Sequence, residues 1–256
     1  MPTPLAADQL RQATAKLPRV PLAHLPTPLE EVPRFAARLN GPRVYVKRDD
    51  CTGMVMGGNK TRHNEFLLGA ALRPDADCLV WGAGVQSNNC RQTAAACNKL
   101  GLECYLYLSR AAHNDDVQGN LLLDHLLGAH ITVIDTPLGP ALDELLLAKA
   151  EELRAAGRRP FVWDRTSGRP IAAVSYALAL AELLEQALDL APSSAEAHTL
   201  MGILRESWGQ DHAAYRSYRT ALEADPHFGP ARDNLRRYCE RFGLDYHSKA
   251  INPGAE

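Results

Sequence analysis

The segment DCLVWGAGVQSNNCRQTAAACNKLGLECYLYLS, residues 77–109, decides the fold class. It opens with an apolar run at 77–82, continues with a helical pattern at 87–101 that ends on Gly101, and closes with a second apolar run at 103–109. Short apolar runs bounded by turns are typical of buried strands, and strands that alternate with helices indicate a parallel sheet covered on both faces. The segment therefore predicts one strand–helix–strand unit of an α/β fold.

The same alternation extends over residues 43–165. Consecutive parallel strands of this kind are joined by right-handed crossovers. The predicted fold class is therefore α/β, with a parallel sheet and flanking helices. We expect strands at 43–48, 77–82, 103–109, 130–135 and 160–164, and helices at 59–72, 87–101, 118–129 and 141–157.

The pattern changes from about Ser175, after which no further strand is predicted. Residues 195–226 predict two amphipathic helices with a turn at Gly209, and 175–192 and 229–243 predict a helix on each side. The spacing is typical of a tetratricopeptide repeat, but one repeat rarely folds alone, so an ordinary helical hairpin is the alternative. The positions that carry the repeat pattern are Gly202, Ala214, Tyr218, Ala221 and Pro226.

These two patterns predict two parts of the chain. Residues 1–186 form an incomplete α/β domain, and residues 187–256 form an all-α, tetratricopeptide-like segment. Repeats of this class present a groove to peptides, so a protein partner is possible through these helices. Apolar surface left by an incomplete sheet favours self-association, so we also expect a homo-oligomer.

The composition excludes several classes of protein. Lysine and arginine total 28 against 30 aspartate and glutamate residues, which gives no electrostatic footprint for nucleic acid or an anionic membrane. No stretch is expected to reach the ~18 apolar residues of a membrane span, and the N-terminus lacks a signal-peptide pattern. The six cysteines form no zinc-type spacing and are expected to be reduced, which favours a cytoplasmic location and no metal.

Lys60 follows Gly57 and Gly58 at the start of a predicted helix. The positive potential at a helix start favours the uncharged amine that must attack an aldehyde. Glycines let the backbone approach a flat cofactor closely. This arrangement predicts an imine-forming lysine, whereas the alternative is a solvated surface lysine.

Gln86-Ser87-Asn88 lies between a predicted strand end and a predicted helix start, where α/β sheets place ligand sites. The helix start offers N–H groups to a carboxylate, Ser87 can bind that carboxylate or relay a proton, and Asn88 can donate to a phenolic oxygen of the cofactor. The alternative is a helix N-cap, for which serine and asparagine are favoured without a catalytic role.

Three segments carry a family resemblance: KRDDCTGMVMGGNKTRHNEFLL, WGAGVQSNNCRQTAAACNKLGLECYLYL and GNLLLDHLLGAHITVI. Over about residues 20–186 the chain resembles the 1-aminocyclopropane-1-carboxylate (ACC) deaminases and D-cysteine desulfhydrases, which are pyridoxal-phosphate enzymes of the tryptophan-synthase β-like fold type II. The resemblance implies that Lys60 holds the cofactor and is catalytic. It also implies that Asn88 contacts the cofactor, Ser87 is catalytic, and Gln86, Ser87 and Asn88 bind a small amino acid.

The resemblance ends near residue 186. Such enzymes continue with strands and a glycine-rich loop that holds the cofactor phosphate, and residues 187–256 offer no such loop. The ending DYHSKAINPG (245–254) partly matches a Tyr-Thr-Gly-Lys-Ala motif of the family, with Tyr246, Lys249 and Ala250 as the matching residues, and a chance match is the alternative. Two hypotheses follow: a deaminase or desulfhydrase acting on D-cysteine or ACC, and a catalytically impaired scaffold that binds protein through its helices.

Overall fold

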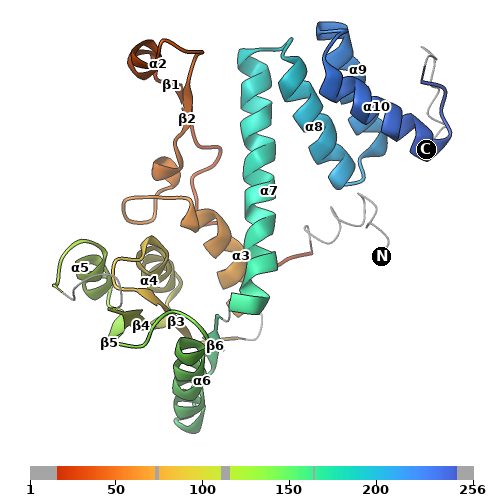
Figure 1. The fold of residues 1–256 in the computed structure, drawn as a ribbon. Helices are drawn as coiled ribbons and strands as arrows, with labels where there is room; N and C mark the ends of the chain where they lie inside the picture. The colour runs from red at the N-terminus through yellow and green to blue at the C-terminus, as the bar shows by residue number, and fades with distance from the viewer. Residues whose placement is uncertain (1–15, 73–74, 111–115, 164, 247–256) are drawn as a thin grey trace. The chain divides into compact units, whose positions relative to one another are not determined.

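The computed structural model describes residues 16–72, 75–110, 116–163 and 165–246, of which 165–169 are described as backbone only. The chain divides into two compact units, and the boundary falls between Ala177 and Leu178, inside one helix. Figure 1 shows the chain from red at its N-terminus to blue at its C-terminus.

The first unit contains a four-stranded parallel sheet with the order β5-β4-β3-β6. The register pairs Cys78 with Glu103 and Tyr105 with His130, so β4 lies between β3 and β5. This confirms the predicted parallel sheet. Its strands are β3 (Cys78–Gly84), β4 (Glu103–Ser109), β5 (His130–Ile134) and β6 (Pro160–Val162).

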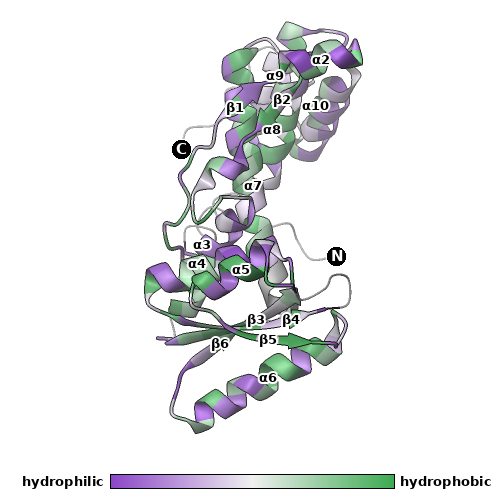
Figure 2. Cartoon of the chain, turned by 90° about the vertical axis from the view of Figure 1, so that its left-hand side faces the viewer, coloured by the Kyte–Doolittle hydropathy of each residue, from purple (hydrophilic) through white to green (hydrophobic). Residues whose placement is uncertain are grey.

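Helices cover both faces of this sheet (Figure 2). The helices α4 (Asn88–Leu100) and α5 (Gly119–Leu126) lie on one face, and α6 (Pro140–Ala155) lies on the other. The helix α3 (Lys60–Leu72) packs against α4. Residues of β3 contribute to a hydrophobic core on each face of the sheet, because successive side chains of a strand point to opposite faces. Leu79 packs on the α4 side, whereas Cys78 and Val80 pack with Leu142 and Leu146 of α6.

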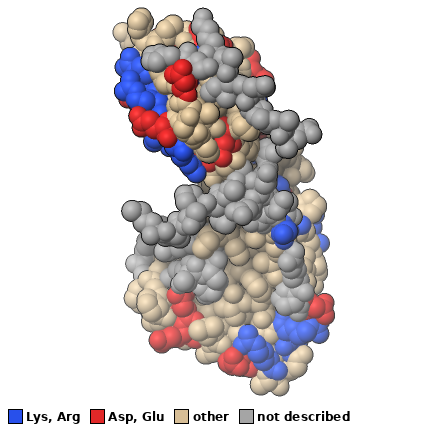
Figure 3. Space-filling view, turned by 90° about the vertical axis from the view of Figure 1, so that its right-hand side faces the viewer, with Lys and Arg blue, Asp and Glu red and all other residues tan. Residues whose placement is uncertain are grey.

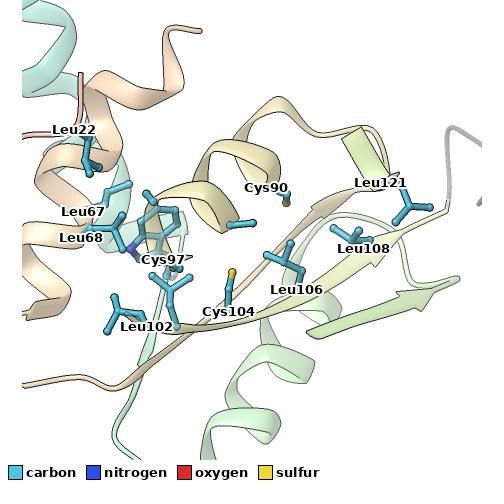
Figure 4. Close-up of a cluster of buried hydrophobic side chains, with 14 of the residues drawn as sticks. Leu22, Leu67, Leu68, Cys90, Cys97, Leu102, Cys104, Leu106, Leu108 and Leu121 are labelled. Atoms are coloured by element: carbon cyan, nitrogen blue, oxygen red, sulfur yellow. The ribbon is translucent and has the colours of Figure 1, made fainter. Parts of the chain in front are cut away.

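The larger core lies between the sheet and the helices α3, α4 and α5 (Figure 4). Three cysteines belong to it, and all six cysteines of the chain are free thiols, five of them buried. Burial raises the pKa of the Cys90 thiol, which keeps it protonated and unreactive. The buried residues of this core include Leu67, Leu68, Leu79, Val85, Cys90, Cys97, Cys104, Leu106, Leu108 and Leu121.

One predicted strand does not join the parallel sheet. Residues 43–48 form the short strand β2 (Tyr45–Lys47), which pairs antiparallel with β1 (Leu29–Glu31) in a separate two-stranded sheet. The helix α2 (Pro33–Leu39) connects the two strands. The strand β2 carries one apolar position, Val46, and that side chain is 42% exposed, so it lacks the buried pattern of a central parallel strand.

The helix α7 (Arg165–Leu190) starts ten residues before Ser175, where the change of pattern is apparent in the sequence. The part Pro170–Leu190 is long and apolar enough to cross a membrane, with a hydropathy of 1.4, so the expectation that no stretch reaches such a length is wrong. Its alanines and leucines, rather than one continuous run of large apolar residues, produce this value. A single helix of this composition also occurs in proteins outside membranes.

The second unit contains α8 (Ala195–Ser207), α9 (Asp211–Ala224) and α10 (Gly229–Phe242), which pack against one another. Gly202 of α8 allows a close approach, because a Cβ there would lie 2.4 Å from the Tyr218 ring. Ala214, Tyr218 and Ala221 of α9 are fully buried. The repeat pattern in the sequence therefore coincides with the helix–helix contacts of this unit.

Candidate functional site

Lys60 is the first residue of α3, as predicted. Its side chain is half-buried, and Nζ donates to the hydroxyl of Tyr176 over 3.3 Å. Asn59 donates to the same hydroxyl from Nδ2 over 2.9 Å. Tyr176 belongs to the part of α7 that lies in the first unit, so the amine is held between two helices of that unit.

The turn before Lys60 has an unusual backbone. All six residues from Gly53 to Gly58 have positive φ, including Val55 at 52°. A β-branched residue in this region is strained, and such strain persists only where the surrounding structure holds it. We call residues 53–58 the left-handed turn.

Gly57 and Gly58 are required by contacts within the chain. A Cβ at Gly57 would lie 1.8 Å from the carbonyl oxygen of Asp50, and one at Gly58 would lie 2.2 Å from Nε2 of Gln92. The two glycines therefore let the left-handed turn pack against residues 49–52 and against α4. Sequence reasoning assigned them instead to the approach of a flat cofactor, which no described contact tests.

Two side chains of α4 hold the left-handed turn. Arg91 donates to the carbonyl oxygens of Val55 and Gly57, and Gln92 donates to Gly57 O over 2.7 Å. Arg91 is 5% exposed, and burial lowers the pKa of its guanidinium. The turn that precedes Lys60 is therefore attached directly to the helix that begins after Ser87.

Ser87 is the N-cap of α4, and its Oγ accepts from the backbone N–H of Cys90 over 3.2 Å. The alternative expectation of a helix N-cap is thus confirmed for Ser87. The first turn of α4 still presents backbone N–H groups at its open end, because N-terminal N–H groups have no partner within a helix. An anionic group is favoured at this position.

Asn120 brings Gln86 and Asn88 together. Its Nδ2 donates to Gln86 O and to Asn88 Oδ1, and its backbone N–H donates to Gln86 Oε1. Because Oδ1 of Asn88 is engaged as an acceptor, the amide orientation leaves the Nδ2 group as the donor. Arg91 donates from Nε to Asn120 Oδ1 over 2.8 Å, so one guanidinium contacts both the left-handed turn and Asn120.

His63 lies one helical turn after Lys60 and is 6% exposed. Nε2 donates to Oδ1 of Asn89 over 3.1 Å, and the ring lies edge-on to Tyr176 with centroids 6.2 Å apart. The pKa of His63 is lowered to about 4, mainly by burial and also by the charge of Lys60, against the opposing effect of the Asn89 bond. His63 is therefore a neutral side chain at neutral pH.

Asp124 is a buried carboxyl of α5 on the same side of the sheet. It is fully buried, and neither of its oxygens has a hydrogen-bond partner within the described residues. Burial raises its pKa to about 7, while the Arg91 guanidinium opposes the shift.

Among the described residues, no group of three or more histidine, cysteine, aspartate or glutamate side chains is placed to hold a metal ion.

Four residues of this site escaped sequence reasoning: Arg91, Asn120, His63 and Tyr176. The first two lie close in sequence to predicted site residues or on the next helix, and only the packing of α5 on α4 brings them together. Tyr176 is separated from Lys60 by 116 positions. No local pattern in the sequence signals that contact.

The fold and the lysine-bearing helix define a class of protein. Residues 20–205 match the family model described as "Pyridoxal-phosphate dependent enzyme", and the chain belongs to this family.

Among curated proteins, the chain is 39% identical over 181 residues to a D-cysteine desulfhydrase of Klebsiella pneumoniae (strain 342), covering 68% of this chain and 54% of that protein. It is 38% identical over 193 residues to one of Salmonella choleraesuis (strain SC-B67), covering 74% of this chain and 56% of that protein. The chain therefore spans about half the length of the curated relatives it matches.

A solved structure also resembles this chain. It is described as an ACC deaminase homologue, with a TM-score of 0.61 and 26% identity, covering 93% of this chain and 74% of that one. Together with the family match, this likeness confirms the predicted α/β fold of the pyridoxal-phosphate enzymes.

The described residues fit one end of pyridoxal phosphate. Lys60 supplies an amine, Asn88 supplies an oriented amide donor, and the start of α4 supplies backbone N–H groups. A phosphate cradle of clustered glycines is not found in the described range 187–246, where glycines occur singly. Tyr246 of the partial C-terminal motif packs with the α9–α10 cluster, and Lys249 and Ala250 lie outside the described residues.

Proposed function

We propose that this protein is a pyridoxal-phosphate-dependent deaminase or desulfhydrase, a lyase-type enzyme acting on a small amino acid such as D-cysteine or ACC. The observation that carries this proposal is the placement of Lys60 at the start of α3, just after a strained turn attached to the helix that begins after Ser87. The identity to D-cysteine desulfhydrases over two thirds of the chain supports it.

Different residues of the site have different roles in such a reaction. Pyridoxal phosphate supplies an electron sink when bound, and the protein supplies orientation and proton transfer. Lys60 Nζ holds the aldehyde carbon and moves a proton at the substrate α-carbon. Asn88 donates from Nδ2 to the phenolic oxygen, and the bond from Asn120 fixes the amide in that orientation.

Gln86, Ser87 and the first N–H groups of α4 bind the substrate carboxylate. A carboxylate is favoured there because the helix start carries positive potential and unpaired N–H donors. In its capping role Ser87 Oγ accepts from Cys90 N, so its hydroxyl proton remains to donate to the carboxylate. The substrate therefore needs a free carboxylate.

Covalent capture of the cofactor tests this proposal. The full chain is incubated with pyridoxal phosphate and reduced with borohydride, and the modified lysine is located by peptide mass spectrometry. We expect the adduct on Lys60, an absorbance band near ~410–430 nm before reduction, and loss of both in Lys60→Ala. Lys149→Ala, which removes a lysine of α6, is the matched control and should leave capture unchanged.

Absence of an adduct at saturating cofactor would contradict the proposal, as would an adduct spread over several lysines. If Lys60 is captured, turnover of D-cysteine and of ACC identifies the reaction. Sulfide release reports elimination from D-cysteine, and ammonia without sulfide reports ring opening and deamination of ACC.

A second candidate function is a catalytically impaired scaffold whose tetratricopeptide-like helices bind a protein. The buried Gly202–Tyr218 contact and the exposed Leu200 and Ile203 of α8 favour it. Its test is a pull-down with residues 1–256 against Leu200→Glu. Specific capture of one protein that the variant loses, together with no cofactor adduct, would favour the scaffold over the enzyme.

Further proposals concern assembly and location. Leu178 and Leu180 of α7 are exposed, and we expect a homo-oligomer that light scattering at micromolar concentration detects. On the face drawn in Figure 3, basic and acidic side chains lie beside one another, and the net charge of −2 agrees with an expected absence of nucleic-acid or membrane partners. A cytoplasmic location remains a proposal.

A further inference from the structure

The hydroxyl of Tyr176 contacts the amine on which the proposed function rests. Lys60 Nζ donates to Tyr176 Oη over 3.3 Å, and Asn59 Nδ2 donates to the same oxygen over 2.9 Å. Nζ also lies 5.9 Å from the centroid of the Tyr176 ring. The amine is therefore located by an oxygen that a second residue holds in place.

A phenol differs from a carboxylate in its response to the charge of lysine. When Lys60 carries three protons, Nζ donates to the phenol oxygen. When Lys60 has lost one proton, the phenol O–H donates to the free lone pair of Nζ, because a hydroxyl is both donor and acceptor. The hydrogen bond therefore persists in both protonation states with its direction reversed, and no other group has to move.

The surroundings keep this contact specific. His63 lies edge-on to the Tyr176 ring and donates to Asn89, so a neutral imidazole lies beside the ring of the phenol. Burial holds His63 uncharged, and it adds no second cation near Lys60. Tyr176 thus provides the polar hydrogen-bond partner of Nζ within the described residues.

We propose that Tyr176 is a further catalytic residue of this site. Its hydroxyl holds the Lys60 amine in position. When the amine is uncharged, the phenol O–H bond breaks as its proton passes to Nζ, which leaves a phenolate beside an ammonium, so the pair keeps the same number of protons. The inference rests on the proposed function, because the amine it serves is the one that holds the cofactor aldehyde. Through Tyr176, the helix α7 contributes a side chain to the site that holds Lys60 of α3.

The test compares wild type with Tyr176→Phe, which removes the hydroxyl and keeps the ring. One readout needs no cofactor: formaldehyde with cyanoborohydride methylates each lysine, and peptide mass spectrometry gives the rate at each position. We expect Lys60 methylation to rise about fivefold in the variant, since the lone pair is no longer engaged and one hydrogen bond corresponds to about this factor. Lys149 and Lys47 should not change.

The second readout is cofactor capture at subsaturating pyridoxal phosphate, which we expect to fall about fivefold because Nζ loses its fixed position. A gain in generic reactivity together with a loss in specific capture is a combination that a merely structural role would not produce. Tyr105→Phe is the matched control: it removes a hydroxyl that donates to Glu103 in β4, and Lys60 should be unaffected.

The outcomes separate the two proposals. No cofactor adduct in wild type would overturn the proposed function, and the methylation rates would still decide the Tyr176–Lys60 contact. Equal methylation and equal capture in wild type and Tyr176→Phe would overturn the inference alone.

A rise at Lys47 as well would show loss of fold, since Lys47 Nζ donates to the carbonyl of Thr27 in the native state. In that case Asn59→Ala decides, because it frees the phenol oxygen from its second donor and leaves Tyr176 in place. A shift of Lys60 methylation in that variant supports the inference, and an unchanged rate overturns it.

Discussion

Arg91 donates from Nε to Oδ1 of Asn120 over 2.8 Å, and this bond joins the two halves of the candidate site. On one side the guanidinium holds the carbonyls of the left-handed turn that precedes Lys60. On the other side Asn120 holds Gln86 and Asn88. The amine and the amide donor are thus positioned by one buried cation.

Asn120→Ala should weaken cofactor capture without removing Lys60 reactivity. The variant loses the contact that orients the Asn88 amide and one of the acceptors of Arg91. We expect the cofactor concentration for half-maximal adduct to rise about fivefold to tenfold, which is the effect of one or two hydrogen bonds. Borohydride capture over a concentration series measures it.

The matched control for that variant is Asn98→Ala. Asn98 lies on α4 and donates to Leu127 O at the end of α5, so it also joins these two helices, but none of its described contacts is with a site residue. An equal effect of the two substitutions would mean that only the packing of α5 on α4 matters.

Gly57→Ala should destabilise the protein strongly. The added Cβ would lie 1.8 Å from Asp50 O, which is backbone and cannot rotate away, and φ is +60°. We expect a loss of about 3 kcal/mol or more in the free energy of unfolding, measured by urea denaturation.

Gly128→Ala separates the steric effect from the backbone effect. Gly128 also has positive φ, at +80°, but open space surrounds its Cβ position. It should lose only about 1–2 kcal/mol, the cost of a side chain in the left-handed region. Similar losses at Gly57 and Gly128 would show that the approach to Asp50 is not tight.

Asp124→Asn should change the pH dependence of stability. Burial raises the pKa of the folded carboxyl to about 7 from its ordinary value of 3.8, so the folded state retains a proton that the unfolded state releases between these values. The stability of wild type due to this group is full below pH 3.8 and is lost as the pH rises to about 7. As the pH rises through that window, the free energy of unfolding of the variant, relative to wild type, should increase by up to about 1.4 kcal/mol per pH unit.

Urea denaturation at a series of pH values measures that difference. Asp135→Asn is the control, because the Asp135 side chain is 85% exposed. A constant difference between Asp124→Asn and wild type from pH 4 to pH 8 would refute the prediction.

His63→Gln should show the opposite slope. The pKa of folded His63 is lowered to about 4 from 6.5, so the unfolded state binds the extra proton between these values. Stability from the neutral imidazole is full above pH 6.5 and is lost as the pH falls through about 4. As the pH falls through that window, the free energy of unfolding of wild type, relative to the variant, should decrease by up to about 1.4 kcal/mol per pH unit. The control is His125→Gln, because the His125 side chain is exposed.

The sequence predicted the regular elements well where periodicity is strong. The strand at 103–109 has the predicted bounds, and Lys60 begins its helix as expected, because apolar runs and a Gly-Gly-Asn-Lys turn are local signals. The pairing of 45–47 was not predictable, since its partner Leu29–Glu31 is three residues long and mostly polar. The contacts of Arg91, Asn120 and Tyr176 depend on how helices pack, and no short-range pattern carries that information.

The positive φ of Val55 has a consequence for engineering. A glycine at this position would relieve the backbone strain and make the chain harder to unfold, because glycine adopts this conformation without cost from a side chain. The same change would let the turn visit other shapes and blur the location of the amine that follows it. At this single residue, the stability of the fold and the precise positioning of the Lys60 amine are opposed. Selection for stability alone is therefore expected to favour variants in which this amine is positioned less precisely.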